Sequence, residues 1–258
     1  MLRYRYLFEQ MVRRELRQKY RGSALGVLWY VINPLILMAA YGVMFGVLLK
    51  AVSIDDYLLF LLVGLTVWVF FASSLLTAAT SLLEQGSVVG KMRFPRETVP
   101  AASVAVQLVT FGVLLAFVAP IAVAVRGTLD PALLLLPLVC ACLFAFVLGL
   151  AMVVAILHAY FRDVAPILSA LLLPWFFVTP ILFRLQDLPG LAGHPWAETL
   201  LEWVNPVTPF VEAMRAILYS GSVPGAGVLI YVVAAAIVAP LAGRAIFRRL
   251  EGELAVVL

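Results

Sequence analysis

Six apolar stretches divide the sequence, each close to the length that an α-helix needs to cross a bilayer. At a rise of 1.5 Å per residue, about 20 apolar residues cross about 30 Å of hydrocarbon. The stretches are Trp29 to Leu49, Leu58 to Leu83, Val99 to Val125, Ala132 to Tyr160, Pro166 to Phe183 and Gly227 to Ala245. Charged residues make up only 12% of the chain, against about 25% in soluble domains. The sequence predicts an all-α membrane protein with six transmembrane helices.

The distribution of cationic residues predicts how these helices are oriented. Seven of the 18 Lys and Arg residues lie within the first 21 positions. If both termini are cytoplasmic, 14 of the 18 fall on the cytoplasmic side, whereas Asp and Glu divide equally between the two sides. Lys and Arg near the ends of spans are retained in the cytoplasm, and acidic residues contribute little. We therefore expect a multi-pass protein of the plasma membrane with cytoplasmic N and C termini.

The first 24 residues have the pattern of a basic amphipathic helix. Apolar residues recur every four positions, at Tyr4, Phe8, Val12, Leu16 and Tyr20. Arg13, Arg14 and Arg17 occupy other positions around the helix. Such a helix lies in the plane of the membrane interface. It could anchor the chain to lipid headgroups or dock a partner, and the sequence leaves both roles open.

The chain carries little that suggests catalysis or metal binding. Cys140 and Cys142 are two positions apart in an apolar stretch, so they point to different faces of a helix. His158 and His194 have no Cys, His or carboxylate neighbours at ligand spacing. The sequence also lacks the Gly-x-x-x-x-Gly-Lys-Ser/Thr loop that cradles phosphates. We expect no catalytic residue, no metal and no cofactor in this chain, and no nucleic-acid partner.

The interiors of the predicted spans contain almost no charged residues. Proton-driven and ion-driven transporters use such groups as relays or coupling sites. A passive pore would need a polar or charged lining, and the intramembrane polar groups are mostly Ser, Thr and Gln107. If the protein moves a substrate, we expect another subunit to supply the energy.

Two connecting segments suggest more than a simple turn. The connection 84–98 combines three cations with an exposed aromatic residue, and its candidate residues are Lys91, Arg93, Phe94, Pro95, Arg96 and Glu97. It could be a charged turn that obeys the positive-inside rule. The aromatic residue next to a proline also suits insertion into the groove of a partner.

The segment 184–224 is too long for a plain turn and too apolar for a disordered loop. Prolines divide it, and one piece places Phe210, Val211, Met214, Ile217 and Leu218 on a helical face with Glu212 and Arg215 off that face. We predict short re-entrant helices at the outer leaflet. They could form a structural lid or take part in substrate exit.

Aromatic residues are frequent in the predicted spans. Most are expected in interfacial belts or helix packing, but uncharged rings that line a pathway would also give flat surfaces on which sugar faces can slide. The candidates for such a pathway are Trp29, Tyr41, Trp68, Phe71, Trp175, Phe176 and Phe183. The sequence alone does not decide between packing and pathway.

Four groups of residues, in order along the whole chain, form a recognisable pattern. They are Tyr20-Arg21-Gly-Ser23-Ala-Leu25-Gly26-Val-Leu28-Trp29 with Asn33-Pro34-Leu35; Phe94-Pro95-Arg96; Phe161-Arg162-Asp163-Val164 followed by Thr179-Pro180-Ile181-Leu182-Phe183; and Asn205-Pro206 with Arg215. This pattern resembles the membrane subunits of type 2 ABC exporters for polysaccharides such as O-antigen, and for teichoic acids. Thr179 and Phe183 depart mildly from it, because the family more often has Ser and Tyr there.

The resemblance implies a single ABC-2 type transmembrane domain over residues 1–258. It implies a homodimer that works with two copies of a separate ATPase, which binds ATP and Mg, to export a lipid-linked glycan. The residues implied in ATPase docking are Arg13, Arg14, Arg17, Lys91, Arg93, Phe94, Pro95, Arg96, Glu97, Arg162 and Asp163. For Arg162 and Asp163, a local ion pair at the start of the fifth span is the alternative.

Two other functions stay open. A type 2 ABC exporter of small lipophilic compounds would share the same fold. A membrane-embedded enzyme that processes lipid-linked glycans is disfavoured, because the sequence shows no carboxylate pair for acid and base catalysis.

Overall fold

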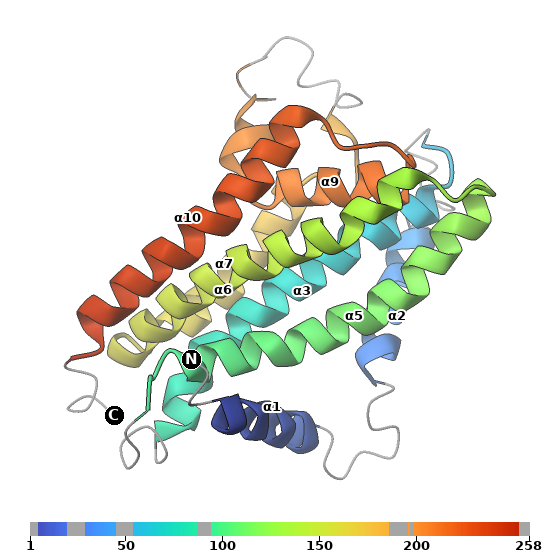
Figure 1. Cartoon of the computed structure of the whole chain (residues 1–258). Helices are drawn as coiled ribbons and strands as arrows, with labels where there is room; N and C mark the ends of the chain where they lie inside the picture. Colours follow the sequence, from blue (N-terminus) through green and yellow to red (C-terminus); the bar gives the residue numbers. More distant parts are fainter. Residues whose placement is uncertain are drawn as a thin grey trace.

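The structure is a computed structural model that describes residues 5–19, 29–44, 54–86, 94–185, 196 and 199–252. Every regular element in these ranges is a helix, which confirms the predicted all-α class for the described part of the chain (Figure 1). The elements are α1 (Arg5–Lys19), α2 (Trp29–Tyr41), α3 (Tyr57–Glu84), α5 (Thr98–Arg126), the 3-10 helix η4 (Pro131–Leu135), α6 (Leu136–Tyr160), α7 (Val164–Val178), the π-helix η7 (Leu200–Val204), α9 (Thr208–Leu218) and α10 (Ala226–Leu250).

Within the described residues, four helical segments are long and apolar enough to cross a membrane: Tyr57–Glu84, Thr98–Arg126, Pro131–Tyr160 and Ala226–Leu250. They coincide with the second, third, fourth and sixth predicted spans. The first predicted span corresponds to α2, which has 13 residues and continues as one π-helical turn to Met44. Residues 45–49 of that prediction lie outside the described part.

The fifth predicted span is shorter than the sequence indicated. We expected it to reach Phe183, but α7 has 15 residues and ends at Val178. Thr179 adopts an extended conformation, with φ −81° and ψ 133°. The ring of Pro180 disfavours helical geometry in the preceding residue and supplies no N–H, so the helix stops there.

The helix α3 forms the centre of the bundle and packs against α2, α5, α6, α7 and α9. Its buried residues cover every side of the helix and include Leu61, Leu65 and Phe71. A helix that is apolar all round belongs inside a protein or a membrane. At the periphery, α10 buries only Val232, Gly243 and Phe247.

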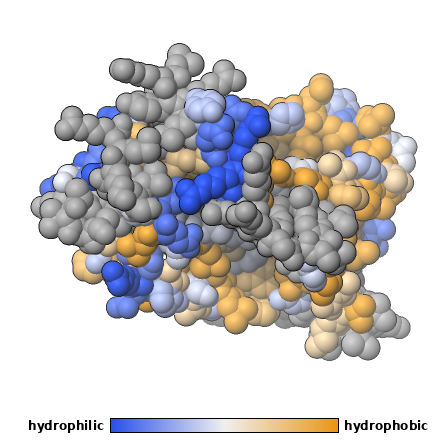
Figure 2. Space-filling model, turned by 90° about the horizontal axis from the view of Figure 1, so that it is seen from below, coloured by the Kyte–Doolittle hydropathy of each residue, from blue (hydrophilic) through white to orange (hydrophobic). Residues whose placement is uncertain are grey.

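A different short helix lies at each end of the bundle (Figure 1). At one end, hereafter the α1 end, α1 lies across the ends of the long helices, and at the opposite end, the α9 end, lies the short helix α9 (Figure 1). The α1 end has its own apolar cluster, formed by Met11, Leu82, Val99, Ala102, Met152, Ala155, Ile156, Ala159 and Phe247. Viewed from the side of α1, hydrophilic residues gather on one part of the surface next to a largely apolar part (Figure 2).

The helices α6 and α10 cross at two glycines with their backbones in close contact. A Cβ atom on Gly149 would lie 2.2 Å from the carbonyl carbon of Ala239, and one on Gly243 would lie 2.2 Å from the carbonyl oxygen of Gly149. Because lipid tails are as apolar as leucine, close packing of small residues is a principal source of helix association in a membrane. The crossing therefore holds α10 on α6.

We expect Gly149→Ala to separate the two helices and to lower the unfolding temperature in detergent. Overpacking of this kind costs about 1–3 kcal/mol, and here the neighbouring atoms are backbone atoms that cannot rotate away. Gly112→Ala in α5 is the matched control, since nothing lies within 4 Å of the added Cβ and alanine is the better helix former. Equal melting temperatures for the two variants would contradict the close crossing.

Candidate functional site

One buried arginine from α9 binds the extended backbone that follows the end of α7. Arg215 is 8% exposed. Its guanidinium donates hydrogen bonds to the carbonyl oxygens of Pro180 and Ile181, the second at 2.6 Å. The guanidinium carbon also lies 3.4 Å from the centroid of the Phe60 ring on α3. A helix that ends inside a protein leaves carbonyls without intrahelical partners, and Arg215 contacts two carbonyls immediately after this end.

The sequence did not indicate the burial of Arg215. The sequence pattern placed Arg215 off the apolar face of its helix, whereas the structure buries it together with Phe210, Val211, Met214, Ile217 and Leu218, each 0% exposed. Gly64 on α3 makes room for it, because a Cβ at this position would lie 2.8 Å from Nη2 of Arg215. The helical periodicity could not indicate that the arginine has partners inside.

A second set of hydrogen bonds connects the same region through an asparagine. The Nε1 of Trp175 donates to Oδ1 of Asn205 at 3.0 Å, and Nδ2 of Asn205 donates to Oγ1 of Thr179 at 2.9 Å. The backbone N–H of Val207 also donates to Oδ1, at 3.2 Å. The sequence elements Thr179-Pro180, Asn205-Pro206 and Arg215, which lie far apart in the chain, therefore meet in one network.

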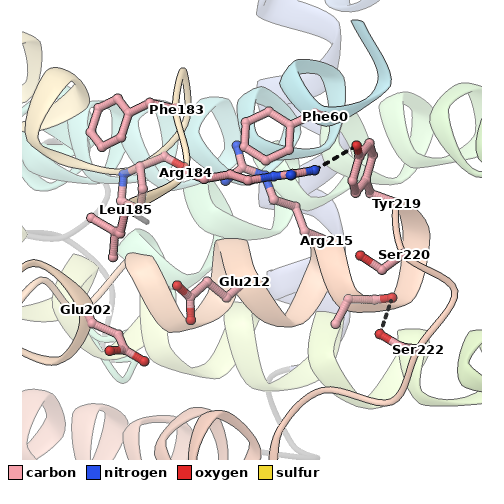
Figure 3. A pocket seen from close by; sticks show the side chains of 12 residues that line it. Phe60, Phe183, Arg184, Leu185, Glu202, Glu212, Arg215, Tyr219, Ser220 and Ser222 are labelled. Carbon is pink, nitrogen blue, oxygen red and sulfur yellow. Dashed lines mark hydrogen bonds between the residues drawn. The ribbon is translucent and has the colours of Figure 1, made fainter. Parts of the chain in front are cut away.

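A pocket with a volume of about 370 Å³ opens beside this network (Figure 3). Its lining combines two guanidiniums and two carboxylates with hydroxyl and apolar groups, from Phe60, Pro180, Phe183, Arg184, Leu185, Glu202, Glu212, Arg215, Ala216, Tyr219, Ser220 and Ser222. The Arg184 guanidinium donates to the Tyr219 hydroxyl at 2.9 Å, and this hydroxyl donates to the carbonyl oxygen of Asp55 at 2.6 Å. Both arginines are thus engaged with the walls of the pocket.

Glu212 stands out among the acidic residues of this pocket. Burial raises the pKa of its carboxyl group from 4.5 to about 7; the nearby carboxylate of Glu202 adds to the increase, and Arg215 opposes it. The helix that carries Glu212 has 11 residues and is too short to span a membrane. The carboxyl group of Glu212, at the α9 end, therefore changes its protonation state near neutral pH.

The structure brings most of the candidate pathway aromatics together. Trp68 lies 5.6 Å from Phe71 and 5.6 Å from Phe176, between ring centroids. Trp175 meets Phe71 edge-on at 5.3 Å, and Tyr41 stacks on Phe176 at 5.5 Å. Trp68, Phe71 and Phe176 are buried within the single chain, so these three rings serve helix packing.

The other two candidates lie elsewhere. The Trp29 side chain on α2 is 38% exposed. Phe183 follows the break after α7 and lines the pocket at the α9 end. They do not belong to the aromatic cluster, so the seven candidates do not form a single surface.

The predicted docking residues of the connection 84–98 are described in part. Lys91 and Arg93 lie outside the described residues. Phe94 is half-buried against the apolar cluster of the α1 end, although we expected an exposed knob. The carbonyl of Pro95 accepts hydrogen bonds from the backbone N–H and the hydroxyl of Thr98, at 3.0 and 2.7 Å, and these bonds fix the turn into α5.

The charged residues of this turn point to the end of α10. The Arg96 guanidinium donates to the carbonyl oxygen of Glu251 at 2.8 Å. Glu97 is 8% exposed, and its carboxylate accepts two hydrogen bonds from Arg244. Sequence reasoning identified Glu97 as a docking residue but missed Arg244, because no local pattern relates positions 147 residues apart.

The remaining predicted docking residues lie at or near the same end. Arg13 and Arg14 are exposed on α1, and Arg13 pairs with Glu9 at 2.6 Å; the side chain of Arg17 lies outside the described part. Arg162 and Asp163 are both exposed between α6 and α7. They form no salt bridge with each other or with another residue in the described ranges, so the structure gives no support to a local ion pair.

Comparison with known proteins identifies the protein family to which this chain belongs. The family model of the ABC-2 type transporter matches residues 6–219. The chain therefore belongs to the ABC-2 type transporter family, as a multi-pass membrane subunit of an ATP-binding-cassette exporter in the bacterial plasma membrane. This role implies an ATP-binding partner that carries out the ATP hydrolysis.

Three relatives within this family are similar to the chain over most of its length. The chain is 31% identical over 252 residues to the O-antigen export system permease protein RfbA of Myxococcus xanthus, an alignment that covers 98% of this chain and 95% of the relative. Two RfbA permease proteins of Klebsiella pneumoniae are 29% and 30% identical over 210 and 213 residues, with 77% of this chain and 80% of each relative covered. All three relatives are described as permeases.

We expect Arg215→Ala to destabilise the α9 end strongly. It leaves two buried carbonyls without donors, and each unsatisfied buried group costs about 1–3 kcal/mol. Arg215→Lys should fall between wild type and Arg215→Ala, because one ammonium lacks the planar fork of a guanidinium. The measurement is thermal unfolding in detergent, with the exposed Arg249→Ala as control. An Arg215→Ala protein as stable as this control would contradict the bracing role.

Glu212 predicts a pH dependence of stability. A carboxyl group whose pKa is higher in the folded than in the unfolded chain binds more protons when folded, so stability falls as the pH rises from about 4.5 to about 7. Glu212→Gln removes this loss, and its melting temperature should exceed that of wild type at pH 8 and approach it at pH 4.5. The exposed Asp163→Asn serves as control. Parallel melting profiles for wild type and Glu212→Gln would refute the assignment.

Proposed function

We propose that this protein is the transmembrane subunit of an exporter that moves a lipid-linked glycan of the O-antigen type across the plasma membrane. The observation that carries the proposal is the alignment with the O-antigen export permease of Myxococcus xanthus, which covers 98% of this chain and almost all of the relative. A match of this extent includes both ends of the bundle. The bracing network around Arg215, which joins family-like elements from three parts of the chain, agrees with it.

We propose six spans with both termini in the cytoplasm. The four long helices supply four spans. The fifth consists of α7 and the extended residues after it, whose backbone carbonyls are satisfied by Arg215. Irregular backbone is tolerated at membrane depth where it is buried in protein. The first span contains α2. The excess of Lys and Arg at the α1 end supports the assignment of the α1 end to the cytoplasmic side.

The segment 184–224 is proposed as the re-entrant region at the outer face. Its helix α9 has 11 residues and buries its apolar face in the bundle, so it returns without crossing. The pocket beside it would then face the outer side of the membrane. The helix braces α7 against α3, and both earlier interpretations, a lid or an element of substrate exit, fit this position.

The ATPase is proposed to dock at the α1 end. Arg13 and Arg14 on α1, and Arg162 and Asp163 after α6, present exposed charges at or near this end. Phe161, next to them, is 65% exposed. Together with the connection 84–98, they offer cations and an exposed ring to a partner, while ATP and Mg would bind in that partner. Charged rims of this kind set the specificity and rate of association.

We propose that two copies of the chain enclose the substrate pathway. Within one copy, Trp68, Phe71 and Phe176 fill the interior with their rings, which supports a route between copies and not through a single bundle. The candidates left with some exposed surface are Trp29, Tyr41, Trp175 and Phe183. Uncharged rings would allow a long glycan to keep moving, because they stack on sugar faces without holding them by charge.

The proposal is tested by depleting the protein in the strain from which it comes. We expect lipid-linked glycan to accumulate inside the cell and surface glycan to fall to near the detection limit, because the proposed exporter supplies the route across the membrane. Both pools are measured by immunoblot of fractionated cells. A matched strain depleted of the partner ATPase should show the same result.

The outcome that favours the second candidate is equally specific. Normal surface glycan together with increased sensitivity to lipophilic drugs would indicate an exporter of small lipophilic compounds. That candidate shares the family and the fold, and no feature of the described residues favours it over glycan export.

A further inference from the structure

The ion pair between Glu97 and Arg244 joins two parts of the chain that lie 147 residues apart in the sequence. Arg244, on the last helix α10, donates from Nε to one carboxylate oxygen at 3.1 Å and from Nη2 to the other at 3.0 Å. The side chain of Glu97 is 9% exposed and that of Arg244 is 42% exposed. A two-pronged pair fixes the direction of both groups, in addition to attracting them.

The position of Glu97 makes this arrangement informative. The residue directly precedes α5, where a carboxylate could accept from the free N–H groups of the first helical turn. Its side chain makes no such cap. It turns to α10 instead, into a largely buried site where an ionised group is costly without a fixed partner. The carboxylate is therefore placed to hold α10.

Two further contacts from neighbouring residues reach the same end of α10. Arg96 donates to the carbonyl oxygen of Glu251 at 2.8 Å, and the Tyr160 hydroxyl, at the end of α6, donates to the carbonyl oxygen of Leu250 at 2.6 Å. Phe247 is fully buried in the cluster that contains Val99. The end of α10 is thus attached to the start of α5 and to the end of α6.

The rest of α10 is attached mainly through α6. The close crossing at Gly149 and Gly243 holds the two backbones together. Arg244 directly follows Gly243, so the ion pair and the crossing act on the same turn of α10. A displacement of residues 94–98 that is transmitted to this turn would move α10 and α6 as one unit.

We propose that Glu97 and Arg244 form the mechanical joint through which movement of the segment 94–98 is passed to α10 and α6. This inference rests on the proposed docking of an ATPase at the α1 end. It assigns Glu97 a positioning role inside the membrane subunit, distinct from contact with the ATPase. Arg244 becomes a coupling residue although it lies outside every segment proposed for docking.

The test uses the complete exporter, that is, this chain purified with its ATPase and reconstituted in proteoliposomes with lipid-linked glycan extracted from the source strain. Three quantities are measured: ATPase retained on the purified membrane subunit, ATP hydrolysed, and glycan moved per ATP. For Glu97→Gln and Arg244→Gln we expect normal ATPase retention and a fall in glycan moved per ATP of about five-fold or more, the range of ordinary coupling between sites. Arg248 is exposed and lies one turn further along α10. Arg248→Gln should match wild type in all three quantities.

Rescue distinguishes a joint from a merely structural contact. The exchanged pair Glu97→Arg with Arg244→Glu should recover part of the glycan moved per ATP. If it does not fold, a second pair replaces it: Glu97→Cys with Arg244→Cys, in a chain where Cys140 and Cys142 are replaced by alanine. Linking these two thiols with a short bifunctional maleimide should raise the glycan moved per ATP above that of the unlinked protein.

Each contrary result has a separate meaning. Unchanged glycan per ATP in both single variants, or no recovery in either paired variant, would overturn the joint. Loss of ATPase retention in Glu97→Gln would overturn it as well and return Glu97 to the docking surface. Failure of the wild-type chain to retain the ATPase or to move glycan would refute the proposed function, independently of the pair.

Discussion

Burying the guanidinium of Arg215 costs free energy. Its hydrogen bonds to the backbone carbonyls after the interruption of α7 offset this cost. Pro180 ends that helix inside the bundle, where its carbonyls have neither water nor a helical neighbour as donor. The planar fork of Arg215 supplies two donors in fixed directions and places its flat face on Phe60. Because Arg215 comes from α9, the same contact that satisfies the break also fixes α9 against α3. Arg215 also lines the pocket together with Phe60 and Phe183, so the shape of the pocket depends on this placement.

The opposite end of the bundle uses a related device. There too, side chains from distant parts of the sequence satisfy charged or polar groups at helix ends: Arg244 pairs with Glu97, and Arg96 and Tyr160 reach carbonyls at the end of α10. The difference lies in exposure. Arg215 is nearly inaccessible to water, which suits a fixed brace. The side chain of Arg244 is 42% exposed, so water can solvate its guanidinium and lower the free-energy cost of breaking the ion pair. A fixed α9 end and an α1 end whose contacts can change agree with the proposal that this subunit passes on movement from one side of the membrane to the other.

The packing of the aromatic residues limits where a pathway can run. Trp68, Phe71 and Phe176 are each in ring contact inside one chain, so they cannot also present free faces to a substrate there. This packing supports the proposed route between two copies of the chain. The amphipathic helix α1 is similarly constrained: Met11 is buried in the cluster of the α1 end, while Arg13 and Arg14 are exposed. One side of the helix therefore packs on the protein, and its cations remain accessible.

The apolar stretches by themselves determined that the chain is helical and membrane-embedded, and they located α3, α5, α6 and α10 to within a few residues. Helix length and hydropathy are local properties, and the bilayer leaves few alternatives to a helix. The motif elements Thr179-Pro180, Asn205-Pro206 and Arg215 were also visible in sequence, but not what they do. Only the tertiary structure decided that Arg215 is buried, that Phe94 packs inward, and that Glu97 meets Arg244. The physical reason is that partners separated by 35 to 147 residues are chosen by helix packing, and periodicity along a single helix carries no information about what lies opposite.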